Sequence, residues 1–373
     1  MQMKIKTVRA ISLVANLPHA TRIGNYVMNK GFSTLVEVET DNGITGIGEA
    51  ITRQGLGATR SLVDELLAPA IVGDDPLDID GIWTKMFNLQ RFRGHSRGYF
   101  LEAISGVDTA LWDVAGKAMG LPVYKLLLGH SRKDFPAYAS SIMLDTPDVM
   151  TKKALEWVKL GWKSIKVKVG QGLEGDFAAC ESIRKAVGPD VILVCDANSA
   201  YNVANATLLG RKLEALDFRW FEEPIPPDDL EGYRILATKL DIPLAAGESE
   251  FSLYGFKQLI DSGVRVIQPD ESRCGGITGA RKVAILCEAM NAEYAPHTGV
   301  SSAVSLMASL HLAASMPAFS TYEYFMSSNP LVSELLLKLI PPMKDNRTSA
   351  PDSPGLGIEL DPRAIAKFSA KAG

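Results

Sequence analysis

The chain has 373 residues, of which 46% are hydrophobic and 22% charged, a composition typical of a folded globular protein rather than a disordered one. Its 39 basic and 43 acidic residues give a net charge of −4 without a long basic run, which argues against a nucleic-acid-binding protein. Because the sequence has no apolar stretch of membrane-spanning length, no signal-peptide pattern and no CxxC pair among its four cysteines, we expect a soluble, cytoplasmic protein with reduced cysteines and no membrane partner.

The first part of the chain has the pattern of an antiparallel sheet followed by helices. β-rich runs cover residues 8–14 and 32–40, and Asp41-Asn42-Gly43 predicts a tight turn before a further strand. Helices are expected from about Ser61 to Ala70 and over residues 102–118, where apolar side chains recur at helical spacing. These elements predict an α+β domain over residues 1–130.

Strands and helices alternate regularly over residues 131–325, which indicates a parallel sheet. Polar residues close seven consecutive strands at intervals of 22 to 28 residues, about one strand–helix unit each: Lys168, Asp196, Glu222, Glu248, Asp270, His297 and Glu323. In an open sheet only the strands near the switch point face the ligand, whereas in a closed barrel all strand ends meet at one mouth. Seven polar strand ends in register therefore favour a barrel.

Residues 326–373 are too few to fold alone, and we expect them to pack back on the N-terminal domain. A short strand is expected at residues 357–360, followed by a helix that Asp361-Pro362 starts.

Strand alternation predicts that two lysines point into the barrel. In residues 164–169 a period of two places Lys166 and Lys168 on one face and the three apolar side chains on the other. The apolar face suits packing against the outer helices. Two inward lysines require anions nearby.

Asp196, Glu222 and Glu248 supply such anions on the next three strands. Three converging carboxylates repel one another unless a cation neutralises them, and oxygen ligands without histidine or cysteine suit Mg²⁺, with Mn²⁺ as an alternative. A zinc hydrolase is disfavoured because the sequence has no HxH pair or other histidine cluster.

The remaining strand ends predict an acid–base pair. Asp270 lies on the strand before His297, where its carboxylate would fix the tautomer of the imidazole and raise its basicity. Glu323 is a candidate to present a carboxyl group to a substrate oxygen. Lys166 beside Lys168 is expected to have a lowered pKa, although the nearby acids oppose this.

This set of residues predicts removal of the proton α to a carboxylate, since a metal ion would stabilise the enediolate that forms. With an acid–base group on each face, returning the proton gives racemisation or epimerisation, and protonating a β-hydroxyl leaving group gives dehydration. A non-catalytic binding module is the alternative from another class, and retention of both bases and all three acids argues against it.

At this point the chain resembles the enolase superfamily, specifically the mandelate racemase/muconate lactonizing enzyme family and its mandelate racemase-like subgroup. The resemblance covers essentially the whole chain and is carried by these segments: Ala110–Lys117, Lys166-Val-Lys168, Asp196-Ala-Asn198, Glu222-Glu-Pro224, Gly247-Glu248, Gln268-Pro-Asp270, Pro296-His297 and Pro354–Ile358.

The resemblance implies an α/β fold: a (β/α)7β modified TIM barrel with an α+β capping domain built from both chain ends. It also implies a homo-oligomer and a small-molecule carboxylate substrate. The residue roles it implies are Mg²⁺ ligation by Asp196, Glu222 and Glu248, one base at Lys168, a lysine at the substrate carboxylate at Lys166, a second base at His297 with Asp270, and a hydrogen-bond donor to the enediolate at Glu323.

In this family the cap loops over the barrel mouth set the substrate, and here we expect those loops around residues 18–30, 52–58 and 91–99. The candidate substrate-binding residues are Arg22, Tyr26, Arg53, His95 and Asn198. Arginines suit a second carboxylate or a polyhydroxylated chain better than an aryl ring. The sequence therefore favours an acid-sugar (aldonate or aldarate) dehydratase that forms a 2-keto-3-deoxy acid. The alternatives are a 2-hydroxy-acid racemase or epimerase and a sugar-acid lactone cycloisomerase.

Overall fold

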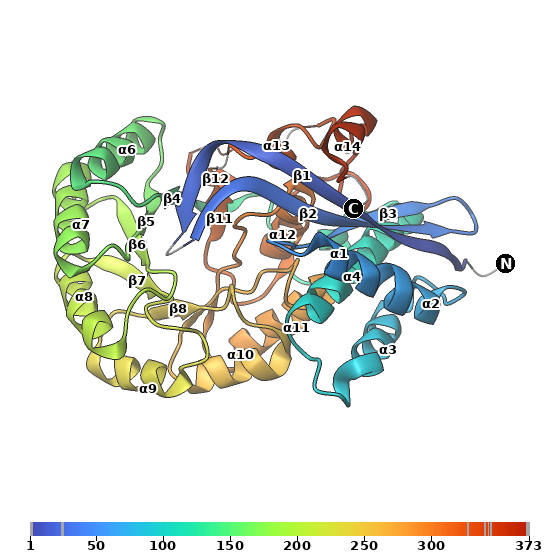
Figure 1. The fold of residues 1–373 in the computed structure, drawn as a ribbon, viewed down its shortest axis with the longest axis horizontal. Helices are drawn as coiled ribbons and strands as arrows, with labels where there is room; N and C mark the ends of the chain where they lie inside the picture. The colour runs from blue at the N-terminus through green and yellow to red at the C-terminus, as the bar shows by residue number, and fades with distance from the viewer. Residues whose placement is uncertain are drawn as a thin grey trace.

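A computed structural model describes residues 3–23, 26–326, 328–338, 341, 343 and 345–370 of the chain. It contains a three-stranded antiparallel sheet near the N-terminus and a larger, mostly parallel sheet surrounded by helices (Figure 1). In this described part, no helix has the length and apolar character needed to cross a membrane.

The N-terminal sheet is a long hairpin with a third strand along one side. Its strands are β1 (Ile5–Ile23), β2 (Tyr26–Thr40) and β3 (Thr45–Ala50). The predicted strands and turn are present, but the loop expected over residues 18–30 is wrong, because β1 and β2 run through it on both sides of residues 24–25. A register shift between Asn16 and Thr21 accommodates Pro18, which has no N–H to give to the ladder.

Six helical segments of the described chain accompany this sheet: α1 (Leu56–Ser61), the π-helix η1 (Leu62–Leu67), α2 (Ala68–Ile71), α3 (Ile79–Arg91), α4 (Tyr99–Met119) and α5 (Val123–Leu126). The helix expected from Ser61 to Ala70 starts earlier, at Leu56 after Gly55 in a left-handed conformation, and its part over Leu62–Leu67 is a π-helix. Helix α4 packs directly on β3. A Cβ atom at Gly46 or Gly48 would lie 2.1 Å from a carbonyl oxygen of α4, so this contact requires glycine.

The barrel has its eight strands in parallel, in the described part of the chain: β4 (Phe135–Ile142), β5 (Ser164–Lys168), β6 (Ile192–Asp196), β7 (Phe218–Glu222), β8 (Leu244–Ala246), β9 (Val266–Ile267), β10 (Glu293–Tyr294) and β11 (Tyr322–Phe325). Strand β11 pairs with β4, and a bridge from Tyr294 to Phe319 joins β10 to the segment before β11, which closes the barrel.

Seven helices connect the eight strands in order: α6 (Pro147–Lys159), α7 (Leu173–Val187), α8 (Val203–Ala215), α9 (Leu230–Lys239), α10 (Ser252–Asp261), α11 (Gly276–Ala289) and α12 (Ala303–Ser315). In Figure 1 α6 to α10 follow one another around the outside of the strands. This arrangement confirms the predicted (β/α)7β barrel.

The C-terminal segment contributes α13 (Pro330–Ser333), β12 (Arg347–Thr348) and α14 (Pro362–Phe368). It packs on the N-terminal elements as predicted: the backbone N–H of Ala370 donates to the carbonyl of Ser12 at 2.8 Å. The strand expected at residues 357–360 is wrong, because the structure has only a single bridge from Leu360 to Leu336 there. Gly357 has a φ of 68°, a left-handed conformation that interrupts a strand.

A buried carboxylate joins the N-terminal sheet to the barrel. Glu49 of β3 accepts hydrogen bonds from the N–H of Ser302 at 2.9 Å, the hydroxyl of Ser302 at 2.6 Å and the N–H of Ser305 at 3.0 Å. These donors lie at the N-terminus of α12, where the helix dipole favours an anion. We call this set of contacts the Glu49 tie.

The apolar interior has two parts. Most buried apolar residues form one continuous core between the strands, the outer helices and the N-terminal elements. A separate cluster occupies the barrel: Tyr138, Val194, Trp220, Ala245, Val266 and Ala295. The four cysteines are free and buried, as predicted: Cys180, Cys195, Cys274 and Cys287.

Candidate active site

Three carboxylates converge at the C-terminal ends of neighbouring barrel strands. Asp196 ends β6, Glu222 ends β7 directly opposite it, and Glu248 follows β8 by two residues. Each offers an oxygen atom, the three atoms lie within 4.8 Å of one another, and all three residues are buried. Carboxylates this close repel strongly in a buried site, and oxygen donors are the ligands that hard divalent cations take. The donor set therefore fits Mg²⁺ or Mn²⁺.

Both lysines of β5 point toward this cluster, as the alternation of the strand predicts. The Nζ atom of Lys166 lies 2.7 Å from Oε1 of Glu222 and 3.4 Å from Oδ2 of Asp196. Lys168 donates to Asp196 and, at 2.8 Å, to Oδ1 of Asn198. The two ammonium groups thus supply the positive charge that the buried carboxylates need.

The lowered pKa expected for Lys166 is wrong in this structure. Burial lowers the pKa of Lys166, but the carboxylates of Glu222 and Glu323 outweigh burial and raise that pKa well above its usual value. The effect of the neighbouring acids is therefore larger than that of the like charge on Lys168.

His297 sits between two carboxylates from neighbouring barrel strands. Its Nδ1 atom lies 2.8 Å from Oδ2 of Asp270, and its Nε2 atom lies 3.1 Å from Oε2 of Glu248. Burial lowers the pKa of His297, but Glu248, Glu323 and Asp270 raise it, to a net value of about 10. Asp270 is held in turn by the hydroxyl of Ser272 at 2.5 Å. The imidazole orientation is therefore fixed from both ring nitrogens.

Glu323 lies in β11, on the other side of Lys166 from Glu222. Its carboxylate accepts hydrogen bonds from the hydroxyl of Ser140 at 2.5 Å and the N–H of Thr298 at 2.9 Å, and it lies 2.6 Å from Nζ of Lys166. Burial raises the pKa of Glu323, but Lys166 and His297 lower it to about 2. In these contacts Glu323 is an acceptor, and its donor role toward a substrate oxygen stays a prediction.

Sequence reasoning missed the side chains that hold Glu222. Gln268 donates from Nε2 to Oε2 of Glu222 at 2.8 Å, and the indole N–H of Trp220 reaches the same oxygen at 3.3 Å. Hydrogen bonds of this kind orient a carboxylate and tune its basicity. The sequence did contain one sign of this contact: Gln268 directly follows β9, two residues before the predicted site residue Asp270.

Only some of the predicted substrate-binding residues lie together in one cavity. Arg53 and Asn198 line a cavity of about 30 Å³ together with Lys168, His297 and Glu248. His95 is exposed and lies outside the lining of this cavity. The side chains of Arg22 and Tyr26 lie outside the described part of the structure.

The chain is similar to known proteins over nearly its whole length. Residues 5–129 match the family model described as mandelate racemase / muconate lactonizing enzyme, N-terminal domain, and residues 149–364 match the model described as enolase C-terminal domain-like. The chain is 32% identical to D-galactarolactone cycloisomerase of Agrobacterium fabrum over 98% of this chain and 99% of that protein. It is 32% identical to arabinonate dehydratase of Saccharolobus solfataricus over 90% of each.

A solved structure covers the chain equally fully. The crystal structure of 3,6-anhydro-D-galactonate cycloisomerase from Zobellia galactanivorans is 31% identical, has a TM-score of 0.89, and aligns with 99% of this chain and 100% of its own.

Proposed function

The chain belongs to the mandelate racemase / muconate lactonizing enzyme family of the enolase superfamily, and on this basis we propose that it eliminates water from a sugar acid, an aldonate or aldarate, to give a 2-keto-3-deoxy acid. The observation that carries the proposal is the presence of two proton-transfer groups, Lys168 and His297, in one cavity beside the carboxylate cluster. Relatives named as acid-sugar dehydratases support the substrate class.

Asp196, Glu222 and Glu248 are the residues that would hold Mg²⁺, with Mn²⁺ as an alternative. When bound, the ion supplies positive charge that stabilises the negative charge developing on the substrate carboxylate. Lys166, held among Glu222, Glu323 and Asp196, is placed to contact that carboxylate.

The reaction needs one group to take the proton from Cα and another to give a proton to the leaving oxygen. Lys168 and His297 are assigned these roles. The Cα–H bond breaks and its electron pair forms the double bond to Cβ, the bond from Cβ to its hydroxyl oxygen breaks, and that oxygen leaves as water with the second proton. The enol so formed becomes the 2-keto-3-deoxy acid when the former Cβ takes a proton and the hydroxyl oxygen on the former Cα releases its proton. Asp270 keeps the imidazole of His297 oriented throughout.

Cycloisomerisation of a sugar-acid ring is a second candidate. It is favoured by the two relatives named as cycloisomerases, which align with this chain along nearly their whole length. The proton removal is the same, and the bond that breaks at Cβ is then the one to the ring oxygen, so that the ring opens without loss of water.

The test is incubation of the protein with Mg²⁺ in D₂O and a panel of aldonates, aldarates, their lactones and simple 2-hydroxy acids, followed by NMR. A 2-keto-3-deoxy product with deuterium at C3 supports dehydration, and ring opening without water loss supports cycloisomerisation. Absence of both product and Cα exchange across the panel would overturn the proposal. The Lys168→Ala protein serves as the inactive control.

A further inference from the structure

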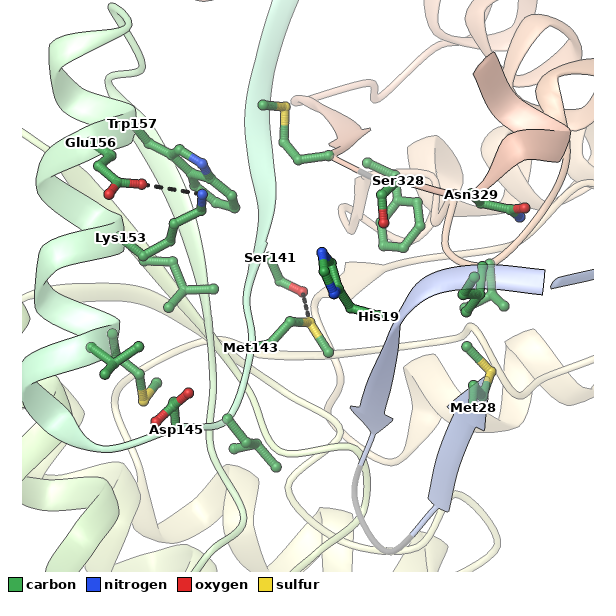
Figure 2. Close-up of a pocket in the computed structure, with 18 of the residues that line it drawn as sticks. His19, Met28, Ser141, Met143, Asp145, Lys153, Glu156, Trp157, Ser328 and Asn329 are labelled. Atoms are coloured by element: carbon green, nitrogen blue, oxygen red, sulfur yellow. Dashed lines mark hydrogen bonds and ion pairs between the residues drawn. The ribbon is translucent and has the colours of Figure 1, made fainter. Parts of the chain in front are cut away.

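A large chamber lies beside the cavity of the candidate active site. Its volume is about 520 Å³, and it lies between α6, the β1–β2 hairpin and the ends of β4 and β11. Figure 2 shows Trp157 and Lys153 on its α6 side and His19 and Met28 on its hairpin side, with Ser141 and Met143 between them. We call this space the distal chamber.

The distal chamber and the catalytic cavity share part of their walls. Four residues line both: Ser141, Met143, Val300 and Phe325. The catalytic cavity, at about 30 Å³, holds little more than a carboxylate group, whereas the distal chamber is large enough for the rest of a six-carbon acid. A substrate whose carboxylate lies at the carboxylate cluster would therefore extend its far end into this chamber.

The lining of the distal chamber is mostly apolar. Leu17 and Met28 come from the hairpin, Met150 and Trp157 from α6, and Met143 and Phe325 from the shared wall. Hydroxyl groups placed against such side chains lose their hydrogen bonds to water without replacement, whereas methylene groups gain by leaving water.

Four charged residues line the distal chamber: Asp145, Lys152, Lys153 and Glu156. Lys153 pairs with Glu156 at 3.2 Å, and the carboxylate of Asp145 accepts from the N–H of Thr146 at 2.7 Å. Lys152 is exposed on α6. These four charged residues are exposed, whereas Met28, Met150 and Trp157 are buried. The part of the chamber that is shielded from water is therefore mainly apolar, with Ser141 and Asn329 as its buried polar residues.

Arg53, the predicted substrate-binding arginine whose side chain is described, lies in the catalytic cavity, where it pairs with Glu248 at 3.5 Å. It does not line the distal chamber. Among the described residues that line the distal chamber there is no arginine.

From these observations, and resting on the proposed function, we propose that the distal chamber binds the end of the substrate remote from its carboxylate and selects an end poor in hydroxyl groups. The substrate class is then a sugar acid with its hydroxyls near the carboxylate and a deoxygenated or ring-closed far end. Leu17 and Val149, which line this chamber and not the catalytic cavity, are its specificity-determining residues.

The test is a comparison of four acids that share the same 2-hydroxycarboxylate head, measured by calorimetric titration of the Mg²⁺-loaded protein. Lactate carries only the head, 2-hydroxyhexanoate adds an alkyl end, gluconate a polyol end and 2-hydroxyadipate a carboxylate end. Each methylene buried should strengthen binding about fourfold, so we expect 2-hydroxyhexanoate to bind at least tenfold tighter than lactate and tighter than gluconate or 2-hydroxyadipate.

Tighter binding of gluconate or 2-hydroxyadipate, with Mg²⁺-dependent binding of lactate intact, would overturn the distal-chamber proposal and leave the proposed function standing. Failure of all four acids to bind in a Mg²⁺-dependent way would overturn the proposed function, and this proposal with it.

Two variants connect the effect to the chamber. Leu17→Asn, on the β1–β2 hairpin, and Val149→Thr, which has a similar shape on a half-exposed position of α6, change residues that line the distal chamber and not the catalytic cavity. Each is expected to weaken 2-hydroxyhexanoate binding about fivefold without changing lactate binding. Leu155→Gln, on the exposed face of the same helix, is the matched control and should change neither. Equal losses for both acids, or none for 2-hydroxyhexanoate in either variant, would argue against the chamber as its binding site.

Discussion

The Nη2 atom of Arg53, which follows the last strand of the N-terminal sheet, lies 3.5 Å from Oε1 of Glu248 on the barrel. A residue of the cap thus places its charge next to a member of the carboxylate cluster that we propose as the metal site. Any change in how the cap packs on the barrel therefore reaches the electrostatics of that cluster directly.

Arg53→Gln is expected to have opposite effects on metal and substrate. This change removes a cation from beside Glu248 and should tighten Mg²⁺ binding by about two- to tenfold, because the guanidinium group of Arg53 no longer competes with Mg²⁺ for that carboxylate. The kcat/KM for the acid substrate should fall, because the substrate anion is no longer attracted by the positive charge of Arg53. Calorimetric titration with Mg²⁺ and steady-state kinetics measure the two effects. Weaker Mg²⁺ binding in this variant would contradict the competition between Arg53 and the metal.

His297→Asn and Lys168→Ala should each lower kcat by about a hundredfold or more, because each removes one of the two proton-transfer groups. Folding and Mg²⁺ binding should persist in His297→Asn. NMR in D₂O with the best substrate of the panel is the measurement, and His130→Asn, at an exposed position, is the control. Full activity in both variants would remove the two-base assignment.

Glu222→Gln should weaken Mg²⁺ binding by about tenfold or more, because the site loses a negative ligand. Gln268→Leu should have a smaller effect in the same direction, since it leaves Glu222 in place but removes the hydrogen bond that orients it. Calorimetric titration with Mg²⁺ compares both with Glu174→Gln, an exposed control. An unchanged affinity in Glu222→Gln would exclude this residue from the ligand set.

Asp108 predicts a specific pH dependence of stability. It lies buried in α4, where burial raises its pKa to about 7 despite the hydrogen bond from the N–H of Thr278. An acid whose pKa is raised on folding is most stabilising while protonated, so its contribution is present below the unfolded pKa of 3.8 and is lost as the pH rises through 7. We expect Asp108→Asn to be about as stable as the wild type near pH 4 and more stable by about 2–4 kcal/mol at pH 8.

Urea unfolding of Asp108→Asn at several pH values between 4 and 8 checks this expectation. Asp190→Asn, at an exposed position, should follow the wild type throughout. A stability difference between Asp108→Asn and wild type that does not grow with pH would show that Asp108 is not the titrating group.

The strand-end residues could be predicted from the sequence because regular repetition fixes them. Asp196 and Glu222 recur at one strand–helix unit apart, and parallel pairing then places them opposite each other. The inward direction of Lys166 follows from alternation along five residues of β5. These properties depend on period and register, which a single sequence contains.

Properties that depend on contacts across the fold were not accessible in the same way. The hydrogen bond from Gln268 to Glu222 joins side chains of different strands, and the pKa of Lys166 depends on which of several charges lies nearer. The local sequence also gave a wrong prediction at Gly357, because the positive φ of this residue interrupts the expected strand.

The Glu49 tie has a consequence for motion. Three hydrogen bonds to one buried carboxylate would have to break together for β3 to separate from α12, and this costs several kcal/mol. The Glu49 tie therefore resists separation of β3 from the barrel, and with it displacement of Arg53, three residues beyond β3, from Glu248.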